Sequence, residues 1–457
     1  ANGEWFGAYC LTEPGAGSDA NSGKTKAVLS EDSSYYLISG QKIWISNAGF
    51  ANLFIVFARI EDDKNITGFI VPNDPSNGIT LGEEESKLGI HASSTRQVFF
   101  NKTKVPVDHM LAERGHGFKI AMNSLNVGRI KLGVACLEAQ RRVIDNAVKY
   151  AKERIQFKKP IAQFGAIKEK LARMATSCYA GESANYRAAN DIELYIKNLH
   201  EEGIQHQKAE LKGVEEFAIE CSIIKVGTSE DIQNCADDGI QIYGGMGFSA
   251  DTPMESAWRD ARIGRIYEGT NEINRLLSVG MLIKKSMKGD LNLMNAVMKV
   301  ASDMTKGVEE KMNIDQTLSI ELQKIKNLKK VFLMIAGSAF QKYGQELEKH
   351  QQTLLALSDM LIEIYFAEST TLRTLKNFNR GYDVTHQMDM TKLYVFDATE
   401  IVLKKSKETI GNITDGEAQI NLLKSVNRLC RYKSLPDVIG LKNRIADQLI
   451  KENNYCF

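Results

Sequence analysis

The chain has 457 residues, which is long enough to bury a large core and to divide into two or three domains. Its 58 basic and 57 acidic residues leave a formal net charge of +1. Such a balance provides no long-range field for holding a polyanion, so we expect no nucleic-acid partner.

Cysteine usage and hydropathy narrow the class of protein further. The seven cysteines are scattered, without a Cys-x-x-Cys pair or a paired Cys/His spacing, so we expect reduced thiols inside a cell. No apolar run approaches the roughly 20 residues needed to span a bilayer, and no charged leader followed by an apolar segment opens the chain. We therefore expect a soluble or peripheral protein that is not secreted.

The first hundred residues alternate short β-rich runs with turn residues. The runs begin at Tyr35, Leu53, Gly68 and Gln97, and each is rich in β-branched and aromatic side chains. This pattern predicts an antiparallel β domain over residues 1–108.

Beyond Gly117 the apolar residues recur at helical spacing with few helix breakers. We expect one long helix there and further helices over residues 163–198, 212–239 and 271–285. Antiparallel helices of this length stack as a bundle, so residues 109–285 are assigned to a helical bundle domain.

The tail, residues 286–457, is helical again. Apolar residues recur around 291–301, 320–349 and 353–379, and Pro436 is the only proline beyond Pro253. We assign the tail to a separate C-terminal helical domain. An amphipathic stripe is more often packed core than membrane contact.

The segment Arg259–Asn274, R-D-A-R-I-G-R-I-Y-E-G-T-N-E-I-N, places Glu268 among cations and directly before a small Gly-Thr turn. Backbone N–H groups of such a turn can face a ligand, and a glutamate buried against an apolar substrate is a stronger base than in water. Alone, the motif is more often a solvated glutamate near a helix start.

Four other segments precede this one in the chain. They are Tyr9–Ala20 (Y-C-L-T-E-P-G-A-G-S-D-A), Lys42–Asn47 (K-I-W-I-S-N), Glu153–Phe157 (E-R-I-Q-F) and Gln241–Phe248 (Q-I-Y-G-G-M-G-F). Together and in this order they closely resemble the acyl-CoA dehydrogenase family over about residues 1–285. The tail resembles the very-long-chain branch, which carries an extra helical domain there. An ordered set of motifs is far more specific than any one of them.

The resemblance implies an α+β fold, in which the β domain is followed by the helical bundle and the C-terminal extension. Family members carry an N-terminal helical domain ahead of the Y-C-L-T-E-P motif, and that domain is expected to be absent from this chain. In the very-long-chain branch the extension is tied to dimer contacts and membrane association. By that likeness, Leu291–Val300 is the best candidate for touching a bilayer, flanked by Lys284, Lys285, Lys288 and Lys299.

The reaction implied is α,β-desaturation of long- or very-long-chain acyl-CoA thioesters in fatty acid β-oxidation. By resemblance, Glu268 takes the α-proton, and the β-hydrogen leaves as hydride to the N5 atom of FAD. An α-proton beside a thioester is weakly acidic and needs a positioned base and stabilisation of the enolate oxygen. Isovaleryl-type members place the base at the position that aligns with Gly128, so Glu268 has no rival. A glycine there also leaves room for a longer chain.

The FAD contacts are carried over residue by residue from the family motifs. They lie in the first two motifs, in the E-R-I-Q-F segment, in the glycine turn and directly after the base: Tyr9, Leu11, Thr12, Gly17, Ser18, Trp44, Ile45, Ser46, Arg154, Gln156, Phe157, Gln241, Gly244, Gly245, Thr270 and Glu272. By resemblance, the E-R-I-Q-F segment and the glycine turn meet the FAD of a neighbouring subunit. An arginine fork suits phosphate, and a glycine turn lets the backbone come close.

The substrate contacts implied by the resemblance are Ser18, Asn126, Arg129, Tyr267 and Gly269. Many family members have aspartate where Asn126 stands, and they usually continue R-x-x-F-G-x-P-I where this chain has Lys158 and Lys159 before Pro160. We interpret His91 as a surface residue. The seven histidines are dispersed, and no metal site is expected.

The implied partners are the acyl-CoA substrate, an electron-transfer flavoprotein as electron acceptor, and at least one further copy of the chain. An acyl-CoA oxidase would use the same base and pass electrons to oxygen. A scaffold protein on the same fold is the other alternative, although a scaffold has no use for a positioned base. The expected location is the cytoplasm in a bacterium, or the mitochondrial matrix or inner-membrane face in a eukaryote.

Overall fold

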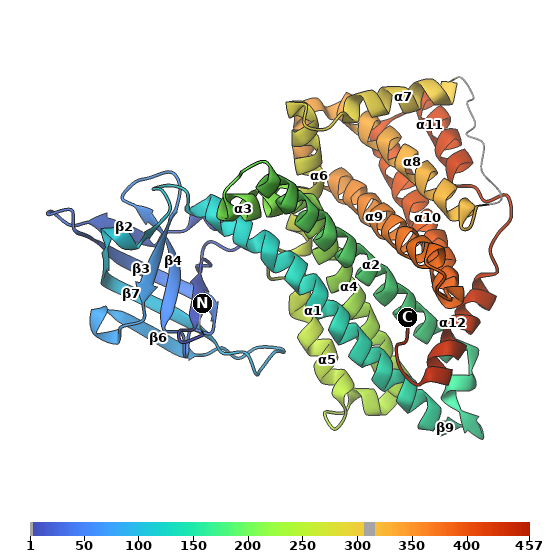
Figure 1. Cartoon of the computed structure of the whole chain (residues 1–457), viewed down its shortest axis with the longest axis horizontal. Coiled ribbons are helices and arrows are strands. Elements are labelled where there is room, and N and C mark those ends of the chain that lie inside the picture. Colours follow the sequence, from blue (N-terminus) through green and yellow to red (C-terminus); the bar gives the residue numbers. More distant parts are fainter. Residues whose placement is uncertain (1–2, 306–315) are drawn as a thin grey trace. The chain divides into compact units, whose positions relative to one another are not determined.

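The computed structural model describes residues 3–305 and 316–457 of the chain (Figure 1). It divides into two compact units, which we call the β unit (residues 1–126) and the helical unit (residues 127–457). The first long helix, α1 (Gly117–Glu153), begins in the β unit and continues into the helical unit.

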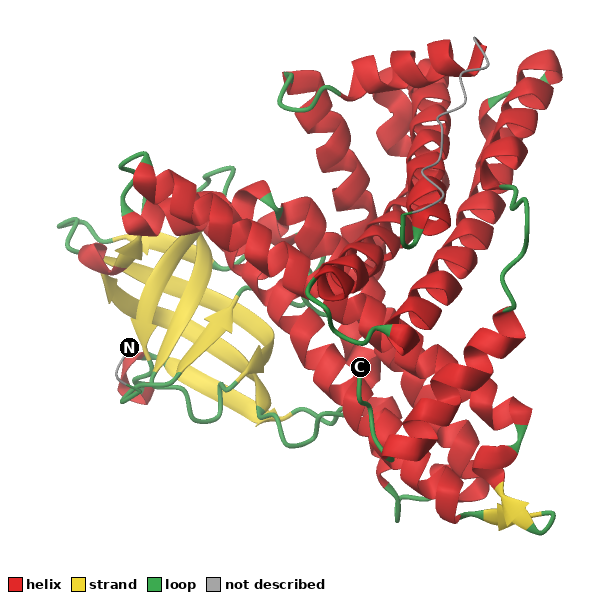
Figure 2. Cartoon of the chain, turned by 45° about the vertical axis from the view of Figure 1, so that its right-hand side comes forward, coloured by secondary structure: helices red, strands yellow, loops and turns green. Residues whose placement is uncertain are grey.

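The β unit is built on one eight-stranded sheet (Figure 2). Seven strands follow the order β6-β7-β3-β2-β4-β5-β8, and β1 pairs with β4 off this path. The strands are β1 (Gly7–Cys10), β2 (Lys26–Leu29), β3 (Tyr35–Ser46), β4 (Leu53–Ile60), β5 (Thr67–Pro72), β6 (Ile79–Glu84), β7 (Thr95–Pro106) and β8 (Met110–Leu111). Alternate residues of β3 and β7 enter the core, as period-2 strands require.

The prediction of an antiparallel domain is right for most strand pairs and wrong for two. β4 runs parallel to both β1 and β2. Short runs of alternating apolar residues identify strands but carry no information on strand direction, which is set by the connections between them.

The helical unit begins with a bundle of helices. They are α1, α2 (Gly165–Glu201), α3 (His206–Glu216), α4 (Ala218–Tyr243), α5 (Pro253–Arg262) and α6 (Asn271–Lys288). Of these, α5 was not predicted. A small hairpin, β9 (Ile155–Gln156) with β10 (Lys159–Pro160), follows α1. The predicted helices over 163–198 and 271–285 correspond closely to α2 and α6, while the predicted 212–239 helix is divided between α3 and α4.

The tail is helical as predicted, and we call residues 286–457 the extension. It contains α7 (Leu293–Thr305), α8 (Ser319–Tyr343), α9 (Gln351–Asn379), α10 (Thr385–Ile413), α11 (Gly416–Cys430) and α12 (Val438–Glu452). Within the two described ranges, no helix combines the length and apolar character needed to cross a bilayer.

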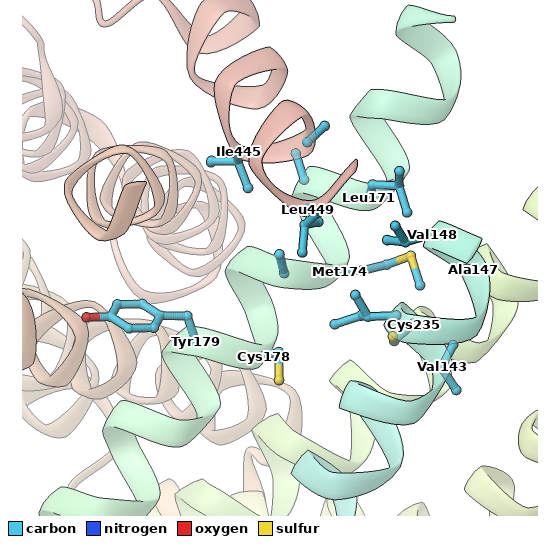
Figure 3. Packing of buried hydrophobic residues seen from close by; sticks show 14 of the residues in the cluster. Val143, Ala147, Val148, Leu171, Met174, Cys178, Tyr179, Cys235, Ile445 and Leu449 are labelled. Carbon is cyan, nitrogen blue, oxygen red and sulfur yellow. The ribbon is translucent and has the colours of Figure 1, made fainter. Parts of the chain in front are cut away.

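The extension is packed into the bundle rather than set apart from it. Figure 3 shows one apolar core in which Ile445 and Leu449 of α12 meet Leu171 of α2 and Val148 of α1. All four side chains are almost fully buried. The bundle and the extension therefore form one compact unit, and the structure divides near residue 126. The predicted domain boundaries at 108 and 285 stay a prediction.

Candidate active site

Glu268 lies on a tight turn between a short 3-10 segment (Ile263–Arg265) and α6. Its backbone is left-handed, with φ of +57°, and the following Gly269 is also left-handed at +80°. Left-handed backbone at a glutamate is uncommon and requires support from its surroundings. Thr270 supplies part of it by capping α6, since its hydroxyl oxygen accepts the N–H of Ile273 at 3.3 Å.

The Glu268 carboxylate lies directly against Gly128 of α1. A Cβ atom at residue 128 would come within 2.7 Å of the Glu268 carboxyl carbon, so only glycine leaves this space open. One carboxylate oxygen, Oε2, is buried and has no hydrogen-bond partner. Burial raises the pKa of Glu268, and the nearby charges of Arg129 and Lys225 offset part of that rise. The result is a carboxylate with an unused oxygen and increased basicity.

Two buried cations, Arg129 and Lys225, support the turn through hydrogen bonds to its backbone carbonyls. The Nε of Arg129 donates to the Glu268 carbonyl at 3.1 Å, and the ammonium of Lys225 donates to the Gly269 carbonyl at 2.7 Å. The Asn274 amide also donates to the Gly269 carbonyl, at 2.8 Å. Burial, together with the charge of Arg129, lowers the pKa of Lys225 to about 8. These donors stabilise a backbone conformation that a glutamate would otherwise avoid.

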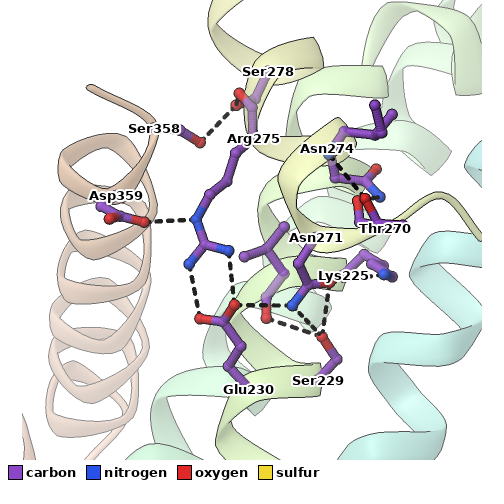
Figure 4. A network of polar contacts seen from close by, with 12 residues as sticks. Lys225, Ser229, Glu230, Thr270, Asn271, Asn274, Arg275, Ser278, Ser358 and Asp359 are labelled. Carbon is purple, nitrogen blue, oxygen red and sulfur yellow. Dashed lines mark hydrogen bonds and ion pairs between the residues drawn. The ribbon is translucent and has the colours of Figure 1, made fainter. Parts of the chain in front are cut away.

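Behind this turn lies a polar network that was not expected from the sequence (Figure 4). It runs from Lys225 through Asn271 to Glu230, and on to Arg275 of α6 and Asp359 of α9. One sequence signal could have indicated part of this network: Lys225 is the single charge within the mostly apolar run Cys221–Val226. Nothing in the local sequence marks Asp359, because its partner is 84 positions away.

In the β unit, a buried ion pair joins the first two motifs. The ammonium of Lys42 lies 2.7 Å from Glu13 and also donates to the carbonyls of Leu11 and Phe57. Glu13 in turn accepts the N–H of Thr25 at 3.1 Å. This pair ties the Y-C-L-T-E-P loop to strands β3 and β4.

The same region presents an exposed aromatic face. Trp44 is 54% exposed with a left-handed backbone, and Ser46 is exposed two residues further on. Thr12 is held beside them, because its carbonyl accepts the N–H of Ile43 at 3.0 Å. Gly17 has open space where a side chain would be. An exposed indole with polar residues nearby in the fold suits a flat ring with polar edges, such as the isoalloxazine of FAD.

Two of the predicted FAD contacts in this region have buried side chains. Ile45 is 2% exposed and belongs to the sheet core, and Leu11 is 8% exposed. Their side chains are therefore not available to a ligand. Tyr9 is half-buried and its hydroxyl donates to the Ala121 carbonyl at 3.4 Å, whereas Ser18 is exposed.

The predicted FAD contacts of the E-R-I-Q-F segment and of the glycine turn lie at another place on the helical unit. Arg154, Gln156 and Phe157 form the hairpin after α1, while Gln241, Gly244 and Gly245 lie where α4 ends. A stacked pair, Tyr150 on Tyr243 with ring centres 4.0 Å apart, joins these two ends. From Gly128 to the end of α1 the helix rises roughly 38 Å, so one chain does not bring these residues to its own Glu268.

The predicted substrate contacts also differ in accessibility. Asn126 and Arg129 are 5% and 3% exposed, and the bond from Arg129 to Glu268 makes it a support of the turn in this structure. Tyr267 is 43% exposed. Of the two predicted FAD contacts after the base, Thr270 caps α6 and Glu272 is exposed in the first turn of that helix. A Cβ at Gly269 would meet the Asn274 amide at 3.1 Å, so this position too has little spare room.

Three family models match the chain. The acyl-CoA dehydrogenase middle domain matches residues 8–103, and two models described as acyl-CoA dehydrogenase C-terminal domains match residues 115–281 and 327–428.

Individual relatives agree with these matches. The chain is 37% identical over 457 residues to a probable acyl-CoA dehydrogenase of Bacillus subtilis, covering all of this chain and 76% of that protein. It is 33% identical over 415 residues to the mitochondrial very long-chain specific acyl-CoA dehydrogenase of Rattus norvegicus, covering 85% of this chain and 60% of the relative.

A solved structure of similar architecture is that of an acyl-CoA dehydrogenase complexed with FAD from Bacillus anthracis. It is 39% identical, with a TM-score of 0.95 over 98% of this chain and 76% of that chain. The butyryl-CoA dehydrogenase of Megasphaera elsdenii is 37% identical, with a TM-score of 0.54 over 61% of this chain and 68% of that chain.

Proposed function

The chain belongs to the acyl-CoA dehydrogenase family of FAD-dependent oxidoreductases acting on CH–CH bonds, and from that premise we propose that it desaturates long- or very-long-chain acyl-CoA thioesters to trans-2-enoyl-CoA. The observation that carries the proposal is the Glu268 carboxylate, which is held on a strained turn with one buried oxygen and no partner. A carboxylate of this kind suits the removal of a weakly acidic proton.

In the proposed mechanism, deprotonated Glu268 takes the proton from the α-carbon of the thioester. Burial raises its pKa and so strengthens it as a base, while the charges of Arg129 and Lys225 favour its ionised form. We assign the backbone N–H of Glu268 to the developing enolate oxygen. The tight support of this turn fixes both groups before the substrate arrives.

FAD, when bound, supplies the acceptor for the hydride from the β-carbon. In the β unit, Thr12, Trp44 and Ser46 would hold its flat ring, because the Trp44 indole is exposed and the Thr12 backbone is hydrogen-bonded to the neighbouring residue Ile43. In the helical unit, Arg154 and the turn at Gly244 and Gly245 would hold the phosphates of FAD bound to a second subunit, and the distance along α1 supports this assignment. Both glycines have open space at the Cβ position, which lets backbone approach a ligand.

The preference for longer chains rests on two observations. The extension is shared with a relative that is named very long-chain specific, over 85% of this chain. Gly128 also places no side chain in front of the carboxylate.

We infer that electrons pass from the enzyme to an electron-transfer flavoprotein.

The first experiment mixes the FAD-loaded protein with palmitoyl-CoA under anaerobic conditions and follows bleaching of the oxidised flavin. The intact protein should bleach, while Glu268→Gln should bind substrate and bleach at least about a thousandfold more slowly. Butyryl-CoA and octanoyl-CoA serve as comparisons for chain length. No bleaching by a fully FAD-loaded protein with any of the three would contradict the proposal and favour a scaffold role.

The acceptor is tested separately, with the reduced enzyme mixed with either oxygen or an electron-transfer flavoprotein. Reoxidation by the flavoprotein at catalytic rates, with slow reaction toward oxygen, is expected. The opposite order would make the protein an acyl-CoA oxidase.

We further propose that the extension makes peripheral contact with membranes inside the cell. Met294 and Met298 of α7 are each at least half exposed, near the lysines at 284, 288 and 299. Cosedimentation with anionic vesicles tests this: replacing both methionines by glutamate should abolish it, and equal binding by the variant would contradict it.

A further inference from the structure

The extension is connected to the catalytic turn by an unbroken chain of charged and polar contacts. We propose that Asp359 of α9 is a positioning residue for Glu268, acting through Arg275, Glu230 and Asn271. The inference rests on the proposed role of Glu268 as the base. It gives the extension a part in the reaction, in addition to packing and surface contacts.

The inner end of the chain of contacts is at the turn itself. Lys225 donates to the Gly269 carbonyl and to Oδ1 of Asn271, both at 2.7 Å. The Nδ2 of Asn271 donates to Glu230 at 2.9 Å. The Asn271 amide is thus held between an ammonium and a carboxylate, and flipping it would set donor against donor and acceptor against acceptor. Asn271 is 1% exposed, so water cannot replace either contact.

The outer end reaches the extension. Arg275 binds Glu230 with two parallel contacts, of 2.7 and 2.8 Å, and its Nε donates to Asp359 at 2.7 Å. Asp359 is held in turn by Lys405 of α10 at 2.9 Å. Figure 4 shows Arg275 lying between Glu230 and Asp359, so one guanidinium links α4, α6 and α9. Such a fork fixes orientation as well as charge.

A neighbouring cavity explains why Asp359 is needed for this arrangement. Glu230, Arg275 and Asp359 line a polar cavity of about 550 Å³, which also contains the carboxylates of Asp231 and Glu363. Without Asp359, the Arg275 side chain has space to move and other carboxyl groups to bind there. If the Arg275 side chain moved away, Glu230 would lose its cationic partner and would hold Asn271 less firmly. The turn at Gly269 would then lose part of its support.

The test compares Asp359→Asn with a matched control in the extension, Asp389→Asn. Asp389 also binds an arginine, Arg444 of α12, through two contacts at 2.8 and 2.9 Å, and it is more deeply buried than Asp359. Both variants remove one charge from a carboxylate that is paired with an arginine. Only Asp359 belongs to the chain of contacts that ends at Glu268.

Amide hydrogen exchange of residues 266–274 provides a readout that needs no turnover. We expect protection there to fall about tenfold or more in Asp359→Asn and to stay at the wild-type level in Asp389→Asn. In turnover with palmitoyl-CoA, kcat should fall about tenfold in Asp359→Asn with KM nearly unchanged, because the base is misplaced while the substrate still binds.

Equal effects in the two variants, or wild-type exchange and kcat in Asp359→Asn, would overturn the inference. If Asp359→Asn fails to fold, Lys405→Met provides a milder disturbance of the same carboxylate, with the same expected order of effects. An inactive wild type would refute the proposed function alone, because the exchange measurement still shows whether Asp359 fixes the turn.

Discussion

Glu268 and Gly128 form a matched pair: the carboxylate occupies the space that a side chain on α1 would take. The two residues are 140 positions apart in the chain, and each explains an unusual feature of the other. Left-handed backbone at Glu268 directs its side chain toward α1. Glycine in the middle of α1 costs about 1 kcal/mol of helix stability relative to alanine. Such local costs are typical of functional sites.

This pairing predicts that Gly128→Ala separates activity from stability. The added methyl would force the flexible Glu268 side chain aside, so kcat should fall about a hundredfold, while better helix propensity preserves or raises the melting temperature. Gly280→Ala on α6 is the control, because its Cβ would meet no atom within 4 Å. Unchanged kcat in Gly128→Ala would show that the carboxylate position does not matter.

Lys225 predicts a change in pH dependence. Its positive charge favours the ionised form of Glu268, so Lys225→Met should raise the pKa of Glu268 further. The base acts when deprotonated, and the acid limb of kcat should therefore move to higher pH. Lys324→Met removes another buried lysine, which donates to the carbonyl of Cys430, and should leave the limb in place. A limb that stays in place in Lys225→Met as well would contradict this account.

At the scale of elements, the position of most helices follows from apolar spacing alone. Strong 3.6-residue periodicity and few breakers are enough to locate α2, α6 and α9. The parallel pairing of β4 and the fusion of bundle and extension depend instead on which faces meet. In the sequence, Ile445 is an ordinary apolar residue of an amphipathic helix, α12. Nothing in its sequence neighbourhood indicates that it packs against α2.

The candidate active site shows the same difference between residues that local sequence identifies and residues that only tertiary contacts bring together. Glu268 and the glycine turns are found from motifs, because short loops that meet ligands have a local signature. Lys225, Asn271, Glu230 and Asp359 are joined only through tertiary contacts. Their residue types are common on solvated helix faces, so their spacing alone cannot predict a network.

The loop carrying Thr12 depends on the Glu13–Lys42 pair. Lys42→Met would leave a carboxylate buried without its counter-ion and should destabilise the protein by about 3–5 kcal/mol. Burial acts to raise the pKa of Glu13, but Lys42 and nearby donors hold it below its usual value, so this stabilisation is present at neutral pH and lost in acid. Urea unfolding and FAD release measure the effect. Lys26→Met, an exposed lysine on β2, is the control that should leave both unchanged.

At the scale of the whole molecule, the motif residues lie in three places: the loop with Trp44, the turn with Glu268, and the far ends of α1 and α4. The third group is roughly 38 Å along α1 from the second, too far to act on the same cofactor within one chain. It also exposes large aromatic side chains, since Phe157 and Phe248 are each 87% exposed. Exposed aromatics of this size are typical of interface anchors.

A homodimer in which this surface meets the other subunit accounts for both observations, and it predicts the behaviour of Phe157→Asp. A buried anchor of this kind contributes about 2–4 kcal/mol, so its replacement by a charge should raise the dimer dissociation constant at least about thirtyfold. Because Arg154 and Gln156 share the hairpin, FAD content should fall with dimer content, which light scattering and flavin absorbance measure together. Leu435→Asp changes another exposed apolar residue, 73% exposed, and should alter neither. If Phe157→Asp stays dimeric and fully loaded with FAD, the hairpin lies outside the interface.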